Sequence, residues 1–180
     1  MRPGRSIVAT LIACAFALGV PINAAFAGYG PPSPPPPGGP PGFGKIIEAK
    51  TVPPSGGKVT ASVPPCVVSV DVTPKTFPKS IELVLRAFDN QGVNWKKLDS
   101  RFLCGVGVTV YEQSGVLTHE PFRKRLVVHF HASSIGRYCQ AFAVADFGHS
   151  TVLHVSISGH TATVQVATDA DLAVSQRAGL

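Results

Sequence analysis

The segment Val68-Ser69-Val70-Asp71-Val72 decides the fold class of this chain. Its valines alternate with Ser69 and Asp71, and such alternation is typical of a β-strand with one buried face and one face in water. The same period of two recurs along the chain, where Gly and Pro clusters separate the repeats. The other alternating segments are residues 59–63, 81–85, 106–110, 126–130, 142–144, 153–157, 164–166 and 172–174.

These segments predict an all-β fold, an antiparallel β-sandwich of about nine short strands. No window of the sequence has a helical period, and residues 89–102 are expected to form a loop with at most one helical turn. Ser158-Gly159 lies between two alternating segments and predicts a tight hairpin turn.

The beginning of this β-rich region has a recognisable order of turns and strands. Residues 55–59 hold a Gly-Gly turn, residues 68–72 a strand, and residues 74–78 a proline-containing bend that leads into residues 81–83. This order resembles the opening of ZU5-like β-sandwich domains and implies an Ig-like or ZU5-like sandwich that acts as a binding or scaffolding module. Some members of that family cleave themselves at a His-Phe-Ser step. Here the step is His129-Phe130-His131, which lacks the hydroxyl, so self-cleavage is not expected.

The end of the chain carries a second resemblance. Residues 164–174, with Asp169 and Asp171, resemble the closing strands of surface β-sandwiches in secreted actinobacterial proteins. The two aspartates also look like a Ca²⁺-ligand pair, but the glycine and distal glutamate of a calcium loop are missing. We therefore expect them to form a turn between the last two strands.

The first 27 residues have the features of a secretory signal peptide. Arg2 and Arg5 precede an apolar stretch at residues 7–20, and Ala25-Phe26-Ala27 matches a cleavage site, so we expect the mature chain to begin after Ala27. An alternative is a lipobox at residues 11–14, which would place a lipid anchor on Cys14. Residues 28–44 are a Pro/Gly-rich linker, residues 45–175 the β-sandwich domain and residues 176–180 a tail.

The length and the charge of the chain limit the classes of partner that it is expected to bind. Removal of 27 of the 180 residues leaves 153, enough for one domain, and lowers the net charge from +6 to +4 because two arginines are lost. The basic residues are scattered along the sequence, without a basic stripe and interleaved aromatics, so no nucleic-acid partner is predicted. No membrane span is expected after signal cleavage, since no second long apolar stretch exists. The expected partner is an unknown extracellular or cell-envelope ligand.

Three cysteines remain in the mature chain, Cys66, Cys104 and Cys139. An oxidising compartment favours one disulfide, and the odd count leaves one thiol. Cys104 is in phase with the buried valines of its strand, so we expect it to form the disulfide, with either Cys66 or Cys139. Cys66 is also in phase with buried valines, and a link between these two would join the two sheets across the core.

The chain also contains histidines that are candidate metal ligands and aromatic residues that are candidates for sugar binding. His129 and His131 share the outward face of one predicted strand, and His154 faces outward on another, so these imidazoles are the candidate ligands for Zn²⁺ or Cu²⁺. No carboxylate or cysteine completes a known metal-binding spacing, so no cofactor is predicted. The aromatic side chains considered for stacking on sugar rings are Trp95, Tyr111 and Tyr138.

Motifs of known hydrolases, P-loops and dinucleotide-binding folds are missing from the sequence. The sequence therefore predicts a secreted or cell-surface, non-catalytic β-sandwich binding module of the adhesion type. Two alternatives remain. One is an extracellular hydrolase whose catalytic residues are dispersed along the chain. The other is an extracellular metal-binding protein that uses the histidine face.

Overall fold

The computed structural model describes residues 44–88, 93–112, 121–144 and 150–178. The chain divides into two units, residues 1–30 and 31–180, and all described residues belong to the second. The predicted signal peptide, the lipidation alternative at Cys14 and the linker up to residue 43 lie outside the described residues. None of the described segments forms a helix long and apolar enough to cross a membrane.

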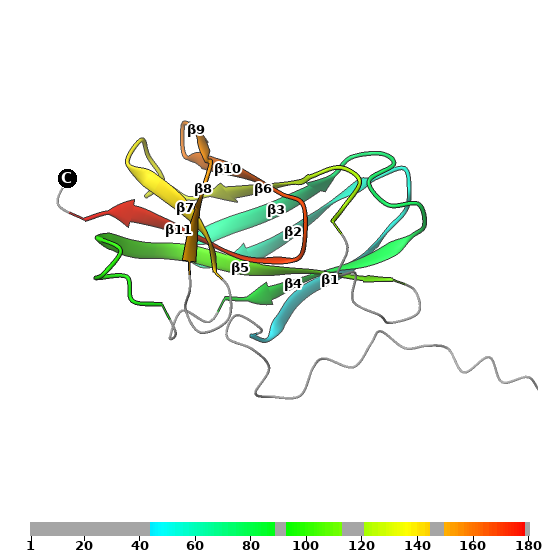
Figure 1. Ribbon diagram of the computed structural model, residues 1–180, viewed down its shortest axis with the longest axis horizontal. Coiled ribbons are helices and arrows are strands. Elements are labelled where there is room, and N and C mark those ends of the chain that lie inside the picture. Colours follow the sequence, from blue (N-terminus) through cyan, green and yellow to red (C-terminus); the bar gives the residue numbers. More distant parts are fainter. Residues whose placement is uncertain (1–43, 89–92, 113–120, 145–149, 179–180) are drawn as a thin grey trace, which may run out of the picture. The chain divides into compact units, whose positions relative to one another are not determined.

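Within the described ranges the structure is all β, with eleven strands in two antiparallel sheets packed against each other (Figure 1). One sheet has the order β1-β4-β5-β11-β7-β8 and the other β2-β3-β6-β10-β9. The predicted antiparallel β-sandwich is thus confirmed. In chain order the strands are β1 Ile46–Val52, β2 Gly57–Val63, β3 Cys66–Val72, β4 Ile81–Ala87, β5 Ser100–Glu112, β6 Leu126–His131, β7 Cys139–Val144, β8 Ser150–Leu153, β9 Ser156–Ser158, β10 Thr161–Val166 and β11 Ala170–Arg177.

Eleven strands are found where about nine were predicted. β1 was not predicted, because its sequence lacks a clean alternation of buried and exposed residues. Residues 153–157 were predicted as one strand but divide into β8, in the six-stranded sheet, and β9, in the five-stranded sheet. Leu153, Val155 and Ile157 all pack against the core, so the apolar period continues unbroken while the hydrogen-bonding partner changes sheet.

The domain boundaries differ slightly from the expected 45–175. The backbone N–H of Gly44 donates to the Ala87 carbonyl, so Gly44, one residue before the expected boundary, already takes part in the fold. At the other end β11 continues to Arg177, two residues past the expected boundary, and Ala178 N donates to the Asp99 carbonyl. Gln176 and Arg177 therefore belong to the last strand and not to a tail.

The main core lies between the two sheets, where the inward phase of every long strand is apolar. Its largest fully buried side chains include Phe130, Leu83, Leu85, Leu126 and Leu172. A second, smaller apolar cluster lies on the outer side of the six-stranded sheet, because Phe142 and Ala173 point away from the main core. Phe88, Trp95, Leu98 and Phe102 pack onto it.

A glycine makes this second cluster possible. A Cβ atom at Gly105 would lie 2.6 Å from the Phe88 ring and 2.7 Å from the Leu172 carbonyl oxygen. The close approach of the Phe88 ring to the strand backbone therefore requires glycine at this position. The second cluster covers part of the outer side of the six-stranded sheet.

The disulfide joins Cys66 of β3 to Cys104 of β5, with the two Cα atoms 6.2 Å apart, and so links the two sheets. This confirms the prediction that Cys104 forms the disulfide and selects Cys66 over Cys139 as its partner. Cys139 is a free, buried thiol. Its Sγ accepts a hydrogen bond from Gly136 N at 3.4 Å.

The predicted hairpin is found, with its turn at Gly159-His160, one residue later than the expected Ser158-Gly159. Ser158 of β9 faces Thr161 of β10, and the two residues between them form the turn. Gly159 has φ of +55°, a left-handed conformation that favours glycine in short hairpin turns.

Candidate functional site

The outer face of the five-stranded sheet carries two cross-strand rows of mostly polar side chains, which we call the polar face. Successive side chains along each strand point to opposite faces of the sheet, so the residues between these polar side chains point into the core. The first row is Thr60, Ser69, His129, Thr163 and Ser156. The second row is Ser62, Val67, His131, Thr161 and Ser158.

His129 is the centre of a hydrogen-bonded chain that crosses three strands. Its Nε2 lies 3.1 Å from Asp71 Oδ2 on β3, and its Nδ1 lies 2.9 Å from Thr163 Oγ1 on β10. In the tautomer protonated at Nε2, the imidazole donates to the carboxylate and accepts from the threonine hydroxyl. Lys58 Nζ lies 3.5 Å from the other carboxylate oxygen of Asp71. The chain therefore fixes the orientation of an imidazole at the middle of the polar face.

The histidines proposed as metal ligands divide between two places. His129 and His131 do share the outward face of β6, and His131 Nδ1 lies 3.1 Å from Thr161 Oγ1. His154 lies in the connection between β8 and β9. Among the residues that the structure describes, no three His, Cys, Asp or Glu side chains are grouped so that they could hold a metal ion. The structure thus does not bring the three imidazoles together.

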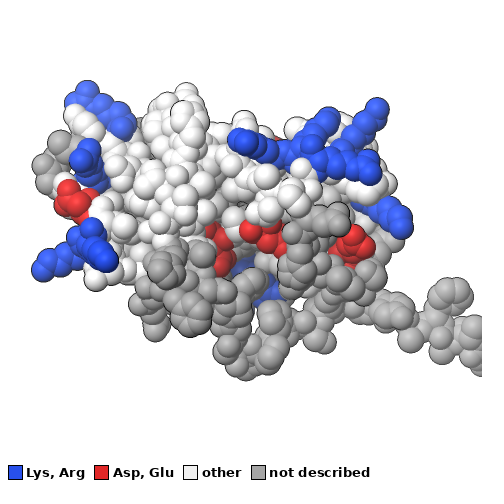
Figure 2. All heavy atoms as spheres, viewed as in Figure 1, with Lys and Arg blue, Asp and Glu red and all other residues white. Residues whose placement is uncertain are grey.

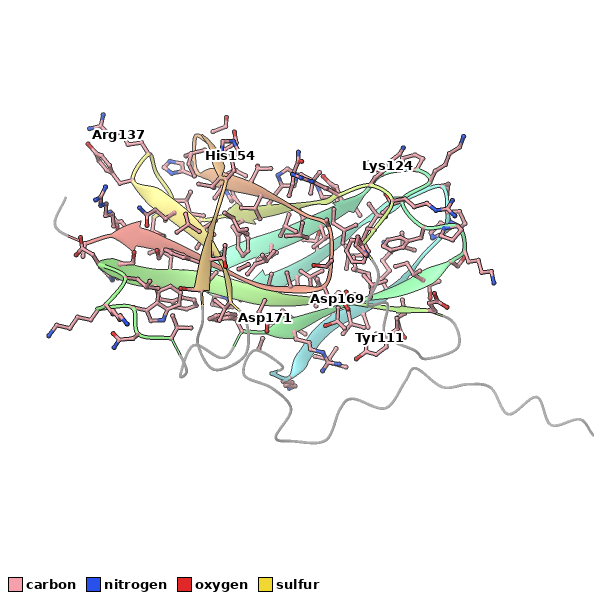
Figure 3. All side chains as sticks on the ribbon, in the orientation of Figure 1. Tyr111, Lys124, Arg137, His154, Asp169 and Asp171 are labelled. Atoms are coloured by element: carbon pink, nitrogen blue, oxygen red, sulfur yellow. A yellow bond between two sulfur atoms is a disulfide. The ribbon has the colours of Figure 1, made fainter. Side chains whose placement is uncertain are left out.

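A second polar group lies on the outer face of the six-stranded sheet. Arg86 and Tyr111 are buried, with 2% and 6% of their surface exposed, and Arg86 Nη2 donates to Tyr111 Oη at 3.0 Å. Figure 3 shows Tyr111, Asp169 and Asp171 on the side of this sheet that faces away from the five-stranded sheet. Arg86 on β4 and Asp171 on β11 are the cross-strand neighbours of Gly107 on β5, one on each side. Because glycine has no side chain, none lies between Arg86 and Asp171 across the sheet.

Asp169 and Asp171 were expected in a turn between the last two strands. Asp169 does lie in the connection between β10 and β11, whereas Asp171 lies within β11. Asp169 Oδ1 accepts a hydrogen bond from Val110 N at 2.9 Å. Burial raises the pKa of Asp169 from 3.8 to about 7, although this hydrogen bond acts in the opposite direction.

Asp169→Asn is expected to stabilise the protein at neutral and higher pH. The raised pKa means that the folded protein holds a proton that the unfolded chain releases, so wild-type stability falls from about pH 4 to pH 7 and the loss is complete above pH 7. Asparagine stays neutral and keeps the acceptor for Val110 N. We expect a gain of about 1–3 kcal/mol in the free energy of unfolding at pH 8, allowing for solvent screening, and almost none at pH 3.5.

Urea unfolding at several pH values measures this effect, with Asp99→Asn, at an exposed carboxylate, as the control. A gain in Asp169→Asn that is the same at pH 3.5 and pH 8 would show that the effect does not come from the carboxyl proton.

The aromatic residues considered for sugar binding do not form a common platform. Tyr111 is buried, and the Trp95 ring packs on Phe102 and Phe142, with centroids 5.2 and 6.0 Å away. Tyr138 is 42% exposed, and the Arg137 guanidinium lies 4.5 Å from its ring centroid. Tyr111 is too buried to stack on a sugar ring, and the half-buried Trp95 packs on the second apolar cluster.

Comparison of the sequence with the models of known protein families gave no match, and comparison with curated proteins gave no match either.

Proposed function

We propose that this protein is an exported, non-catalytic binding module that recognises an extracellular or cell-envelope ligand through the polar face. The observation that carries this proposal is the ordered array itself. Hydroxyl and imidazole groups both donate and accept hydrogen bonds, and two rows of them stand in register over five strands. Thr60, Ser62, His131, Ser156 and Ser158 are exposed, so a ligand has access to both rows.

Export is supported by two independent features. The sequence of residues 1–27 has the pattern of a signal peptide. The disulfide between Cys66 and Cys104 is of the kind that persists in oxidising compartments and is rare in the cytosol. Both features fit a protein that works outside the cytoplasm.

A hydrolase is the second candidate function, because Asp71, His129 and Thr163 follow the order of carboxylate, imidazole and hydroxyl found in hydrolytic triads. Acyl transfer also needs backbone N–H groups that bind the developing oxyanion. β10 pairs with β6 on one side and β9 on the other over Thr161–Thr163, so the N–H of Thr163 belongs to the ladder. This geometry favours binding over catalysis.

The double variant His129→Ala/His131→Ala is expected to lose ligand binding. The probes are insoluble polyhydroxylated polymers, namely cellulose, chitin and bacterial peptidoglycan, in a co-sedimentation assay. We expect the wild type to bind at least one of them, and the variant to bind about tenfold more weakly, because two central hydrogen-bonding groups are lost. The control is Val152→Ala, an exposed position on the edge strand of the other sheet, which should leave binding unchanged.

Equal binding by the double variant and the wild type would show that recognition occurs elsewhere. Hydrolysis of p-nitrophenyl acetate that disappears in Thr163→Val would favour the hydrolase instead. The N-terminal sequence of the protein recovered from the medium of the producing cells tests export, and it should begin at Gly28.

A further inference from the structure

Two basic segments that are distant in sequence lie together at one end of the sandwich. Lys75 and Lys79 belong to the connection between β3 and β4, and Arg123-Lys124-Arg125 precedes β6. Lys124 Nζ donates to the Pro74 carbonyl at 2.8 Å, which joins the two segments directly. Figure 3 places Lys124 at the same end of the domain where Lys and Arg atoms gather in Figure 2. We call these five cations the basic patch.

Apolar packing beneath the basic patch fixes the two segments relative to each other. The rings of Phe77 and Phe122, one from each segment, are buried and meet edge to face with centroids 5.1 Å apart. Phe122 N also donates to the Ala167 carbonyl at 2.6 Å. On the other segment, the buried Thr76 Oγ1 donates to the Thr73 carbonyl at 2.7 Å. The backbone under the patch is therefore preorganised, while all five cationic side chains are exposed.

Lys75 is held in an uncommon backbone conformation. Its φ is +65°, in the left-handed region that favours glycine, and its N–H donates to the Pro54 carbonyl at 2.8 Å. Such a residue costs conformational energy, and residues of this kind concentrate in ligand-binding segments. The turn thus presents a lysine where glycine would be less strained.

The two segments that form the basic patch contain cations and no carboxylates. The described residues 73–79 and 121–125 contain five Lys or Arg and no Asp or Glu. The neighbouring Lys58 differs, because it pairs with Asp71. At the opposite end of the sandwich, Lys96 and Lys97 lie close in sequence to Asp99, and Figure 2 shows the basic atoms there in separate groups. Among the described residues, the first end has the denser group of cations, and Glu82 and Glu112 lie near it, at the start of β4 and the end of β5.

From this geometry we infer that the basic patch binds a linear polyanion, specifically an acidic polysaccharide that carries sulfate or carboxylate groups. A polysaccharide of this kind needs only ion pairs and hydrogen bonds, which exposed Lys and Arg supply. Single-stranded nucleic acid binds best where bases stack on exposed aromatic rings, and both aromatic rings of the patch are buried. Interfacial membrane binding adds inserted apolar side chains, and the described exposed large apolar residues, Val67, Tyr138 and Val152, lie outside the patch.

The test uses immobilised heparin as a sulfated polysaccharide and the purified protein. Lys79→Gln/Arg123→Gln/Arg125→Gln removes three exposed cations from the patch, and Lys96→Gln/Lys97→Gln/Arg101→Gln removes three exposed cations from the opposite end. Both triple variants have the same net charge. We expect the patch variant to bind heparin at least about tenfold more weakly at about 50 mM NaCl and with a shallower salt dependence, while the control stays within about twofold of wild type.

Equal losses of heparin binding in the two triple variants would overturn the inference, because binding would then depend on net charge and not on the position of the cations. Failure of the wild type to bind heparin at about 50 mM NaCl would also overturn it. Tighter binding to duplex DNA, or to vesicles containing phosphatidylserine, than to heparin would assign the patch to another class of partner and exclude the polysaccharide. Thermal unfolding of both variants shows that the fold is retained. Binding through the polar face is measured by other variants and on cellulose and chitin, which carry no sulfate or carboxylate groups, so the two proposals fail independently.

Discussion

Phe130→Ala is expected to lower the free energy of unfolding by about 3–5 kcal/mol. Phe130 is 0% exposed on β6, which is the central strand of the five-stranded sheet, and it faces Val68 on β3 and Ala162 on β10. Truncation removes a large buried ring and leaves a cavity between the two packed sheets. The neighbouring side chains fill this cavity only partly. Urea unfolding of the purified protein measures the change.

The control for this substitution is Val152→Ala. Val152 is 65% exposed on the edge strand β8, so its truncation should change the free energy of unfolding by less than about 0.5 kcal/mol. A loss below about 1 kcal/mol in Phe130→Ala would contradict the position of Phe130 in the core.

Removal of the disulfide in Cys66→Ala/Cys104→Ala is the second large effect, with an expected loss of about 4 kcal/mol. The two cysteines are 38 residues apart in sequence, and the link restricts the unfolded chain over that whole loop. The loss is expected to be large also because the link is the covalent connection between β3 of one sheet and β5 of the other. Denaturant unfolding under non-reducing conditions measures it.

The matched control is Cys139→Ala, which removes a buried thiol without breaking the link. We expect it to cost about 1 kcal/mol. Peptide mapping without reduction should show Cys66 joined to Cys104, and Cys139 should react with iodoacetamide only after unfolding. Free thiols at Cys66 and Cys104 in the protein purified without a reductant would contradict this connectivity.

The fold class and the disulfide were predictable because both depend on phase along a single strand. Alternation in residues 68–72 shows which side chains are buried, and Cys66 and Cys104 lie in register with buried valines. The phase alone left Cys139 open as a partner, since it shows only that a side chain points inward. Which inward side chains meet depends on the order of strands in the two sheets.

The contacts of the candidate site were not predictable for the same reason. Asp71, His129 and Thr163 each have an outward phase, but their hydrogen bonds require β3, β6 and β10 to be neighbours. The basic patch depends in the same way on a contact between segments far apart in sequence. Arg86 differs, because its outward phase predicts exposure, and yet it is 2% exposed and donates a hydrogen bond to the buried Tyr111.

The division of residues 150–158 between β8 and β9 has a consequence for self-association. β8 and β9 are edge strands of different sheets with only four and three residues, so this side offers few unpaired backbone groups to a strand of another molecule. On the other side the edge strands β1 and β2 are longer, but Lys50 Nζ reaches across from β1 to the Lys58 carbonyl on β2 at 3.1 Å. Charged lysines on both edges oppose the addition of a further strand. Short edge strands on one side and lysines on the edge strands of the other side therefore protect the sandwich from edge-to-edge aggregation at high local concentration.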